Sequence, residues 1–141
     1  MVFCLINLIG IICLALCFRK KSNLQWKIVF IGLFFLSAFR AEGMGADYYS
    51  YEKLYKAFLA GDYLGYEPLY IMLNIICSHF GGYRVVVVTV AALSLMGPIR
   101  YIKKNSAMPI LSLWLYISMG FYLWTFTIYR QAIAISFALF A

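Results

Sequence analysis

The sequence predicts an all-α, polytopic transmembrane fold with amphipathic or re-entrant helices in an outer loop. Hydrophobic residues make up 65% of the 141 positions, charged residues only 12%, and the mean hydropathy is +0.88. Soluble domains have about 45–50% apolar and about 25% charged residues. The apolar residues form long runs separated by basic loops, and all five acidic residues lie within residues 42–67. We therefore expect a single membrane domain, residues 1–141.

Several apolar runs approach the length of about 20 residues that crosses the hydrocarbon core of a membrane. They cover residues 2–18, 24–40, 84–102 and 108–127, and a further span begins at 131–141. A basic cluster follows the first run, whereas a signal peptide carries its charge before the apolar core. We expect this run to be retained as a span with the N-terminus outside. Because the last run is too short to cross, we also expect the chain to be the N-terminal part of a longer polytopic protein.

The distribution of lysine and arginine predicts the topology, since positively charged loops stay cytoplasmic. The basic residues of two loops account for the whole net charge of +7: Arg19, Lys20, Lys21, Lys27, Arg100, Lys103 and Lys104. Both loops are cytoplasmic only if residues 69–80, a short apolar segment, dip into the membrane or lie at its surface. That choice places residues 41–83 in an outer loop.

Two helices are expected within this outer loop. Aromatic residues at helical spacing predict an amphipathic helix over residues 47–60, with Asp47 suited to its N-cap and a Glu52–Lys56 pair on one face. Pro68 suits the first turn of the second helix. One side of that helix consists of Leu69, Leu73, Ile76 and Phe80, and the other of Tyr70, Asn74 and Ser78. Such a helix can lie on the membrane or re-enter between spans.

Three arginines at the ends of apolar runs are candidate phosphate ligands: Arg40, Arg84 and Arg130. A planar guanidinium binds phosphate oxygens through two parallel hydrogen bonds, and a charge beside a membrane span is a functional candidate by default. The alternatives are snorkelling to the membrane interface and ion pairing with a nearby acid. Gln131 follows Arg130 into the last apolar run and adds a polar group to that candidate site.

Acids and tyrosines of the outer loop supply the other candidates. Asp47 and Glu67 are flanked by residues that shape the chain, and either would act as a general base if held near a sugar hydroxyl, because desolvation raises the pKa of a carboxylate. Helix capping is the alternative role for both. Tyr48 and Tyr51 are candidates for stacking on sugars, although interfacial tyrosines are expected in any membrane protein.

Several classes of function have no support in the sequence. It contains no phosphate-binding loop, dinucleotide fingerprint, zinc-protease motif or nucleophile elbow. The four cysteines lack C-x-x-C spacing and His79 is the single histidine, so we expect no metal site and no cofactor. The basic residues are distributed according to topology and not clustered on a soluble face, which argues against nucleic-acid binding.

Three motifs occur in a defined order along the chain. The first is Arg40 followed by Gly43-Met44-Gly45-Ala46-Asp47-Tyr48 and Tyr51, the second is Tyr66-Glu67-Pro68-Leu69-Tyr70 with Leu73-Asn74, and the third is Tyr129-Arg130-Gln131-Ala132-Ile133-Ala134-Ile135-Ser136. A span ending in Arg100-Tyr101-Ile102-Lys103-Lys104 precedes the third. In these motifs and their spacing the chain resembles the EpsG family of Wzy-like membrane proteins of bacterial exopolysaccharide and capsule biosynthesis.

The resemblance implies a polymerase that joins undecaprenyl-pyrophosphate-linked oligosaccharide repeat units on the outer side of the bacterial cytoplasmic membrane. Proteins of this type resemble inverting glycosyltransferases that use no nucleotide sugar. Carried onto this sequence, Arg130 and Arg40 hold the departing pyrophosphate, and Asp47 or Glu67 orients or deprotonates the acceptor hydroxyl. The implied partners are the lipid-linked oligosaccharide, membrane lipid and other polysaccharide synthesis or export proteins. Family members are longer, so this chain alone is expected to be inactive.

Two other functions stay open. A transporter or flippase would bind a lipid-linked anion with the same arginines, but the complete spans lack the charges near mid-span that would favour transport. A non-catalytic accessory subunit would need only its spans to assemble other proteins. Small residues that support such contacts are confined to Ala91, Ala92 and Ser94.

Overall fold

The computed structural model describes residues 23–63 and 65–140, and no strand occurs in these two ranges. The expected all-α class is therefore confirmed for the part of the chain described. The helices in chain order are α2 (Asn23–Ala38), α3 (Tyr48–Leu59), α4 (Pro68–Phe80), α5 (Tyr83–Asn105), α6 (Pro109–Ser118), the 3-10 helix η1 (Phe121–Leu123), α7 (Trp124–Thr127) and α8 (Tyr129–Phe140). The expected first span, residues 2–18, and the side of the membrane on which it begins lie outside the described residues.

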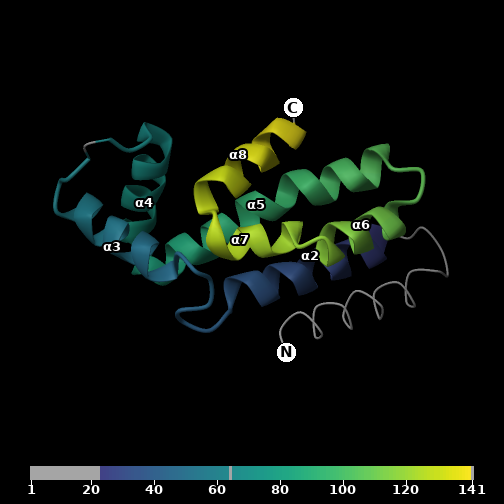
Figure 1. Cartoon of the computed structure of the whole chain (residues 1–141), viewed down its shortest axis with the longest axis horizontal. Coiled ribbons are helices and arrows are strands. Elements are labelled where there is room, and N and C mark those ends of the chain that lie inside the picture. Colours follow the sequence, from purple (N-terminus) through teal and green to yellow (C-terminus); the bar gives the residue numbers. More distant parts are fainter. Residues whose placement is uncertain (1–22, 64, 141) are drawn as a thin grey trace.

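Helix α5 is the centre of the fold, with α8 along one side and α2 along the other (Figure 1). Val86 and Leu95 on α5 are fully buried. Gly97 allows the close approach of α8, because a Cβ at this position would lie 2.0 Å from the carbonyl oxygen of Ser136. The backbone amide of Gly97 donates a hydrogen bond to the Ser136 hydroxyl, with 2.9 Å between nitrogen and oxygen. The absence of a side chain at Gly97 thus sets the spacing between α5 and α8.

Helix α2 packs against α5 and against the segment that contains η1. Val29 and Leu33 of α2 are buried with Leu95 of α5 in one apolar cluster. The Tyr122 hydroxyl crosses to α2 and donates to the carbonyl oxygen of Leu33 at 2.7 Å. This contact satisfies a buried phenol and attaches η1 to α2.

The outer loop forms two helices, α3 and α4, at one end of the molecule (Figure 1). Helix α3 confirms the amphipathic segment expected at residues 47–60, with Tyr51, Tyr55 and Phe58 buried on one face. The Glu52–Lys56 pair is present, with 2.7 Å between the carboxylate oxygen and Nζ. Pro68 occupies the first turn of α4, as its fixed φ favours.

The two faces of α4 are inverted relative to a helix on a soluble protein. The buried face carries Tyr70, Asn74 and Cys77. The exposed face is apolar and consists of Leu69, Met72, Ile76 and Phe80. Helices of soluble domains bury the apolar side instead. The expected division of α4 into two sides is therefore present in part. Its polar side faces the protein, but Leu73, which was expected on the apolar side, packs against the buried cluster.

One described helix, α5, is long and apolar enough to cross a membrane, and the pair formed by residues Pro109–Ser118 and Phe121–Thr127 would be a second if it acts as one span. This pair occupies the span expected at residues 108–127, but it is bent by 62°. The break coincides with Gly120, whose φ of +83° lies in the left-handed region that favours glycine. Helix α2 and helix α4 are shorter apolar helices. The number of crossings therefore stays a prediction.

Candidate functional site

Ends of several helices converge on one buried tyrosine, Tyr129, which is the first residue of α8 and is fully buried. We call the residues joined through it the Tyr129 cluster. Its members are Arg40, Tyr48, Tyr51, Glu67, Tyr70, Tyr83, Thr125, Tyr129 and Arg130. They come from the residues after α2, from α3, from the start of α4, from the start of α5, and from the α7–α8 junction. Residues far apart in the sequence thus form one polar and aromatic group.

Arg40 is an internal crosslink of this cluster, since only 4% of its surface is exposed. One terminal nitrogen donates to the carbonyl oxygen of Thr125 at 3.1 Å, and the other donates to the Tyr129 hydroxyl. The guanidinium also lies 5.0 Å from the ring centroid of Phe126 and 5.1 Å from that of Tyr129. A buried charge is tolerated only when such partners replace water. Its Nε has no hydrogen-bond partner among the described residues.

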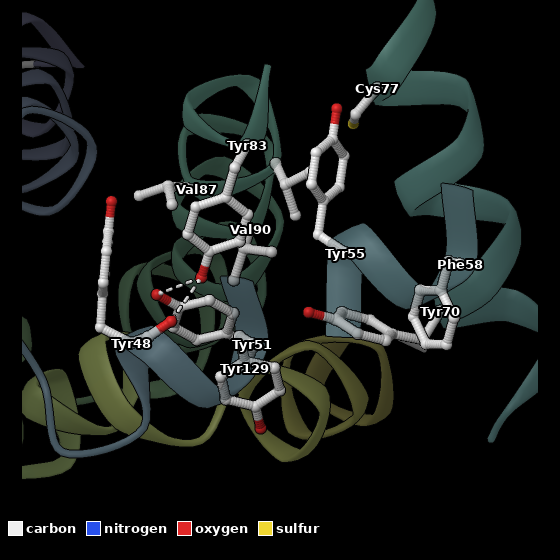
Figure 2. Close-up of a cluster of buried hydrophobic side chains, with 11 residues drawn as sticks. Tyr48, Tyr51, Tyr55, Phe58, Tyr70, Cys77, Tyr83, Val87, Val90 and Tyr129 are labelled. Carbon is white, nitrogen blue, oxygen red and sulfur yellow. Dashed lines mark hydrogen bonds between the residues drawn. The ribbon is translucent and has the colours of Figure 1, made fainter. Parts of the chain in front are cut away.

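Tyr129 connects α8 to the outer loop through its ring and its hydroxyl (Figure 2). The ring stacks on Tyr51 with 4.2 Å between centroids and 8° between planes. The Tyr83 hydroxyl lies 3.5 Å from the Tyr129 hydroxyl and 3.2 Å from the carbonyl oxygen of Tyr48. Aromatic pairs of this kind stabilise by about 0.5–1.5 kcal/mol beyond the area they bury. Tyr129 therefore fixes the position of α3 relative to the start of α8.

Arg130, the next residue along α8, forms an ion pair with Glu67 at the start of α4. Both side chains are accessible, with 38% of Arg130 and 58% of Glu67 exposed. The hydrogen bond from Arg130 lowers the pKa of Glu67. The pKa of Arg130 is raised, mainly by the hydrogen bond with Glu67 and less by the Tyr51 hydroxyl. Unlike Arg40, the Arg130 side chain is exposed enough to contact a ligand.

Tyr70 and Asn74, one turn apart on the inner face of α4, carry buried polar atoms without partners among the described residues. These atoms are the hydroxyl oxygen of Tyr70 and Oδ1 of Asn74. Burial raises the pKa of Tyr70, and the adjacent Asn74 side chain opposes that change more than the charge of Arg130 does. An unsatisfied buried polar group costs about 1–3 kcal/mol. Because Tyr70 is also close enough to Arg130 to interact with its charge, this part of the Tyr129 cluster is the best candidate for a polar ligand site.

A family model for the EpsG family matches residues 23–141, which include all three sequence motifs. The chain belongs to the EpsG family. Searches of the curated proteins and of the solved structures find no match. Membership places the chain among the membrane proteins of polysaccharide biosynthesis and agrees with the resemblance noted in the sequence.

Most of the predicted site residues lie in the EpsG-family motifs and come close together in the structure. The structure brings together five predicted residues: Arg40, Tyr48, Tyr51, Glu67 and Arg130. Three others lie exposed on the surface: Asp47, Arg84 and Gln131. Asp47 occupies the N-cap position of α3, but its side chain makes no capping hydrogen bond.

The sequence analysis did not identify some residues that form or support the Tyr129 cluster. Tyr129 precedes Arg130 in the third EpsG-family motif, where only the charge attracted attention. Thr125 contributes a backbone carbonyl, which no side-chain pattern can reveal. Gly45 has a φ of +114°, and a Cβ there would lie 2.1 Å from the carbonyl oxygen of Phe126. The glycine of the first motif therefore lets the outer loop pack directly on α7.

Proposed function

We propose that this chain is part of a polymerase that joins undecaprenyl-pyrophosphate-linked oligosaccharide repeat units on the outer face of the bacterial cytoplasmic membrane. In this proposal the protein is multi-pass, with its N-terminus outside. The observation that carries the proposal is the accessible Arg130–Glu67 pair, held beside unpartnered polar atoms of α4 within the EpsG-family motifs. This arrangement places a cation, a carboxylate and hydroxyl groups within one small region.

Arg130 is the proposed ligand of the pyrophosphate. Negative charge grows on the pyrophosphate as its bond to the sugar breaks, and a preorganised cation stabilises that charge in the transition state. The guanidinium fork suits phosphate oxygens. Arg40 has a supporting role, because its buried guanidinium is bonded to Thr125 and Tyr129 and fixes the residue that precedes Arg130. In this proposal Arg130 contacts the substrate, and Arg40 holds Arg130 in position.

Glu67 is the proposed base for the acceptor hydroxyl. While it is bonded to Arg130 its lowered pKa makes it a weak base. Binding of pyrophosphate to Arg130 would replace the carboxylate and raise its pKa, so that the base becomes active only with the donor in place. Asp47 is the alternative base, since it is exposed and not engaged in a cap.

The transporter and accessory-subunit hypotheses make different demands on the same residues. Arg40 is a buried charge, which a transport site would use, but it lies just beyond the end of α2 and not near the middle of a span. Binding at the ends of helices favours chemistry at a surface-facing site. An accessory subunit would not need the Arg130 side chain at all.

The test is complementation of a host that lacks the full-length parent gene, with polymer length and lipid-linked intermediates analysed by gel and mass spectrometry. Arg130→Ala is expected to leave single repeat units on the outer side with no long polymer. Lys53→Ala, which removes an exposed cation from α3, is the matched control and is expected to complement fully. Repeat units trapped on the cytoplasmic side would indicate a flippase, and unchanged polymer would exclude the pyrophosphate role of Arg130.

A further inference from the structure

An apolar cavity of about 330 Å³ lies between α5, α8 and the bent segment of α6, η1 and α7. Its walls include Pro98, Tyr101, Phe121, Trp124, Ile135 and Leu139. Ser94 and Thr125 also line it, but the Ser94 hydroxyl donates to the carbonyl oxygen of Ala91 and the Thr125 hydroxyl to that of Tyr122. The cavity volume is within the range of about 300–1,000 Å³ that is typical of ligand sites. Its chemistry fits a hydrocarbon chain.

The cavity adjoins the Tyr129 cluster through one shared residue. Thr125 lines the cavity, and its carbonyl oxygen accepts the hydrogen bond from buried Arg40. Ala132, two residues after Arg130 on α8, also lines the cavity. An apolar cavity that adjoins a cluster with an accessible cation is complementary to an apolar chain that carries an anionic group at one end.

We propose that this cavity holds a segment of the isoprenoid chain of the lipid-linked substrate while its pyrophosphate lies at Arg130. The inference rests on the proposed function and adds a site for the lipid half of the donor. The volume accommodates only part of a long chain, so the remainder lies in the surrounding lipid. The bend between α6 and η1 helps to form the cavity, because the break at Gly120 places Phe121 and Trp124 in one of its walls.

The first test is photo-crosslinking in host membranes that contain the full-length parent. A photoreactive benzoylphenylalanine replaces Ile135, which lines the cavity, or Phe137, which is exposed on α8 and does not line it. After irradiation, mass spectrometry of the adduct is expected to find an undecaprenyl lipid at position 135 and not at position 137. Glycerophospholipid at both positions, or a crosslink to protein at position 135, would overturn the proposal.

The second test narrows the cavity. Leu139→Trp enlarges a wall residue and fills part of the cavity. Phe137→Trp is the matched control, because it introduces the same side chain on the same helix outside the cavity. Exclusion of two methylene-sized groups of the chain corresponds to a loss of about tenfold in affinity. We expect the yield of the undecaprenyl adduct at position 135 to fall about tenfold in the first variant and to stay unchanged in the second. Equal adduct yields in both variants would contradict the site.

The two proposals fail separately. If the lipid adduct forms at position 135 but no polymer is made by the parent in any assay, the lipid site stands and the polymerase assignment falls. If polymer forms normally while position 135 captures no undecaprenyl lipid, the polymerase assignment stands and the cavity has another occupant.

Discussion

Arg130 at the start of α8 and Glu67 at the start of α4 form an ion pair across 63 positions of sequence. The pair connects the outer loop to the last described helix at a point where both side chains are accessible. Accessible ion pairs stabilise a fold by only about 0–1 kcal/mol. The pair also lies near the buried Tyr70 hydroxyl, which has no hydrogen-bond partner among the described residues, and this placement points to a binding role.

Glu67→Gln is expected to separate stability from activity. The change removes the charge that Arg130 binds. The free energy of unfolding of the full-length parent should therefore change by less than about 1 kcal/mol, while polymer yield falls sharply. The exposed Glu52–Lys56 pair supplies the control, and Glu52→Gln should alter neither property. Equal polymer yield from Glu67→Gln and wild type would remove Glu67 from the catalytic assignment.

The lowered pKa of Glu67 predicts a specific pH dependence of stability. An unfolded glutamate has a pKa of about 4.3, and the folded value is lower because of the hydrogen bond from Arg130. The contribution of the pair is therefore present above about pH 4.3 and is lost as the pH falls through the folded pKa. The difference in melting temperature between wild type and Glu67→Gln should be constant from pH 5 to 8 and shrink below pH 4. A difference that changes near neutral pH would show that the carboxylate has a raised pKa instead.

Arg40→Ala is expected to destabilise the protein, since it leaves the Thr125 carbonyl and the Tyr129 hydroxyl without their charged partner. Loss of buried hydrogen bonds of this kind costs about 1–3 kcal/mol for each group left unsatisfied. Arg40→Lys should restore little, because one ammonium cannot reproduce the two directions of the guanidinium. Denaturant unfolding of the parent in detergent measures both effects. Wild-type stability for Arg40→Ala would show that the crosslink is unimportant.

Tyr129→Phe keeps the ring that stacks on Tyr51 and removes the hydroxyl that Arg40 binds. We expect a loss of stability of about 1–3 kcal/mol with the packing of α3 retained. Tyr49→Phe is the control, because Tyr49 is 61% exposed, and it should change stability by less than about 0.5 kcal/mol. Near-UV circular dichroism would report whether the aromatic cluster survives. Its loss in Tyr129→Phe would assign the main role to the hydroxyl network.

Gly97→Ala tests the close approach of α5 and α8. A methyl group there would overlap the Ser136 carbonyl, and overpacking of a well-packed contact costs about 1–3 kcal/mol or more. At Gly32 of α2 a Cβ meets nothing within 4 Å, so Gly32→Ala should be neutral or stabilising by about 0.5–1 kcal/mol. The melting temperature should therefore fall in Gly97→Ala and stay unchanged or rise in Gly32→Ala. A similar shift in both would mean that α8 adjusts its position freely.

Local sequence patterns were sufficient to predict the two helices of the outer loop, but not the contacts within the candidate site. The aromatic spacing of α3 and the position of Pro68 follow from short-range rules, and both predictions were confirmed. The bend at Gly120 was not anticipated, because an uninterrupted apolar run resembles a straight span and one glycine is tolerated in helices. The composition correctly indicated an apolar helical segment at residues 108–127, but only the backbone conformation reveals the break within it.

The candidate site divides in the same way. Arg130 and Glu67 were identified by residue type, but their contact depends on the packing of α4 against α5 and of α5 against α8, which spacing alone does not encode. Arg40 was expected to face a ligand directly, and its burial follows from tertiary neighbours on α7 and α8. Whether Asp47 or Glu67 acts as base was open in the sequence and is a matter for the variants described above.

The single side-chain acceptor of the Arg40 guanidinium has an evolutionary consequence. The Tyr129 hydroxyl is the only side chain that accepts a hydrogen bond from this buried cation among the described residues, so we expect a change at either position alone to be destabilising. Positions 40 and 129 should therefore covary among members of the family. Lineages that lose the arginine should also replace the tyrosine, whereas positions 52 and 56 should drift independently.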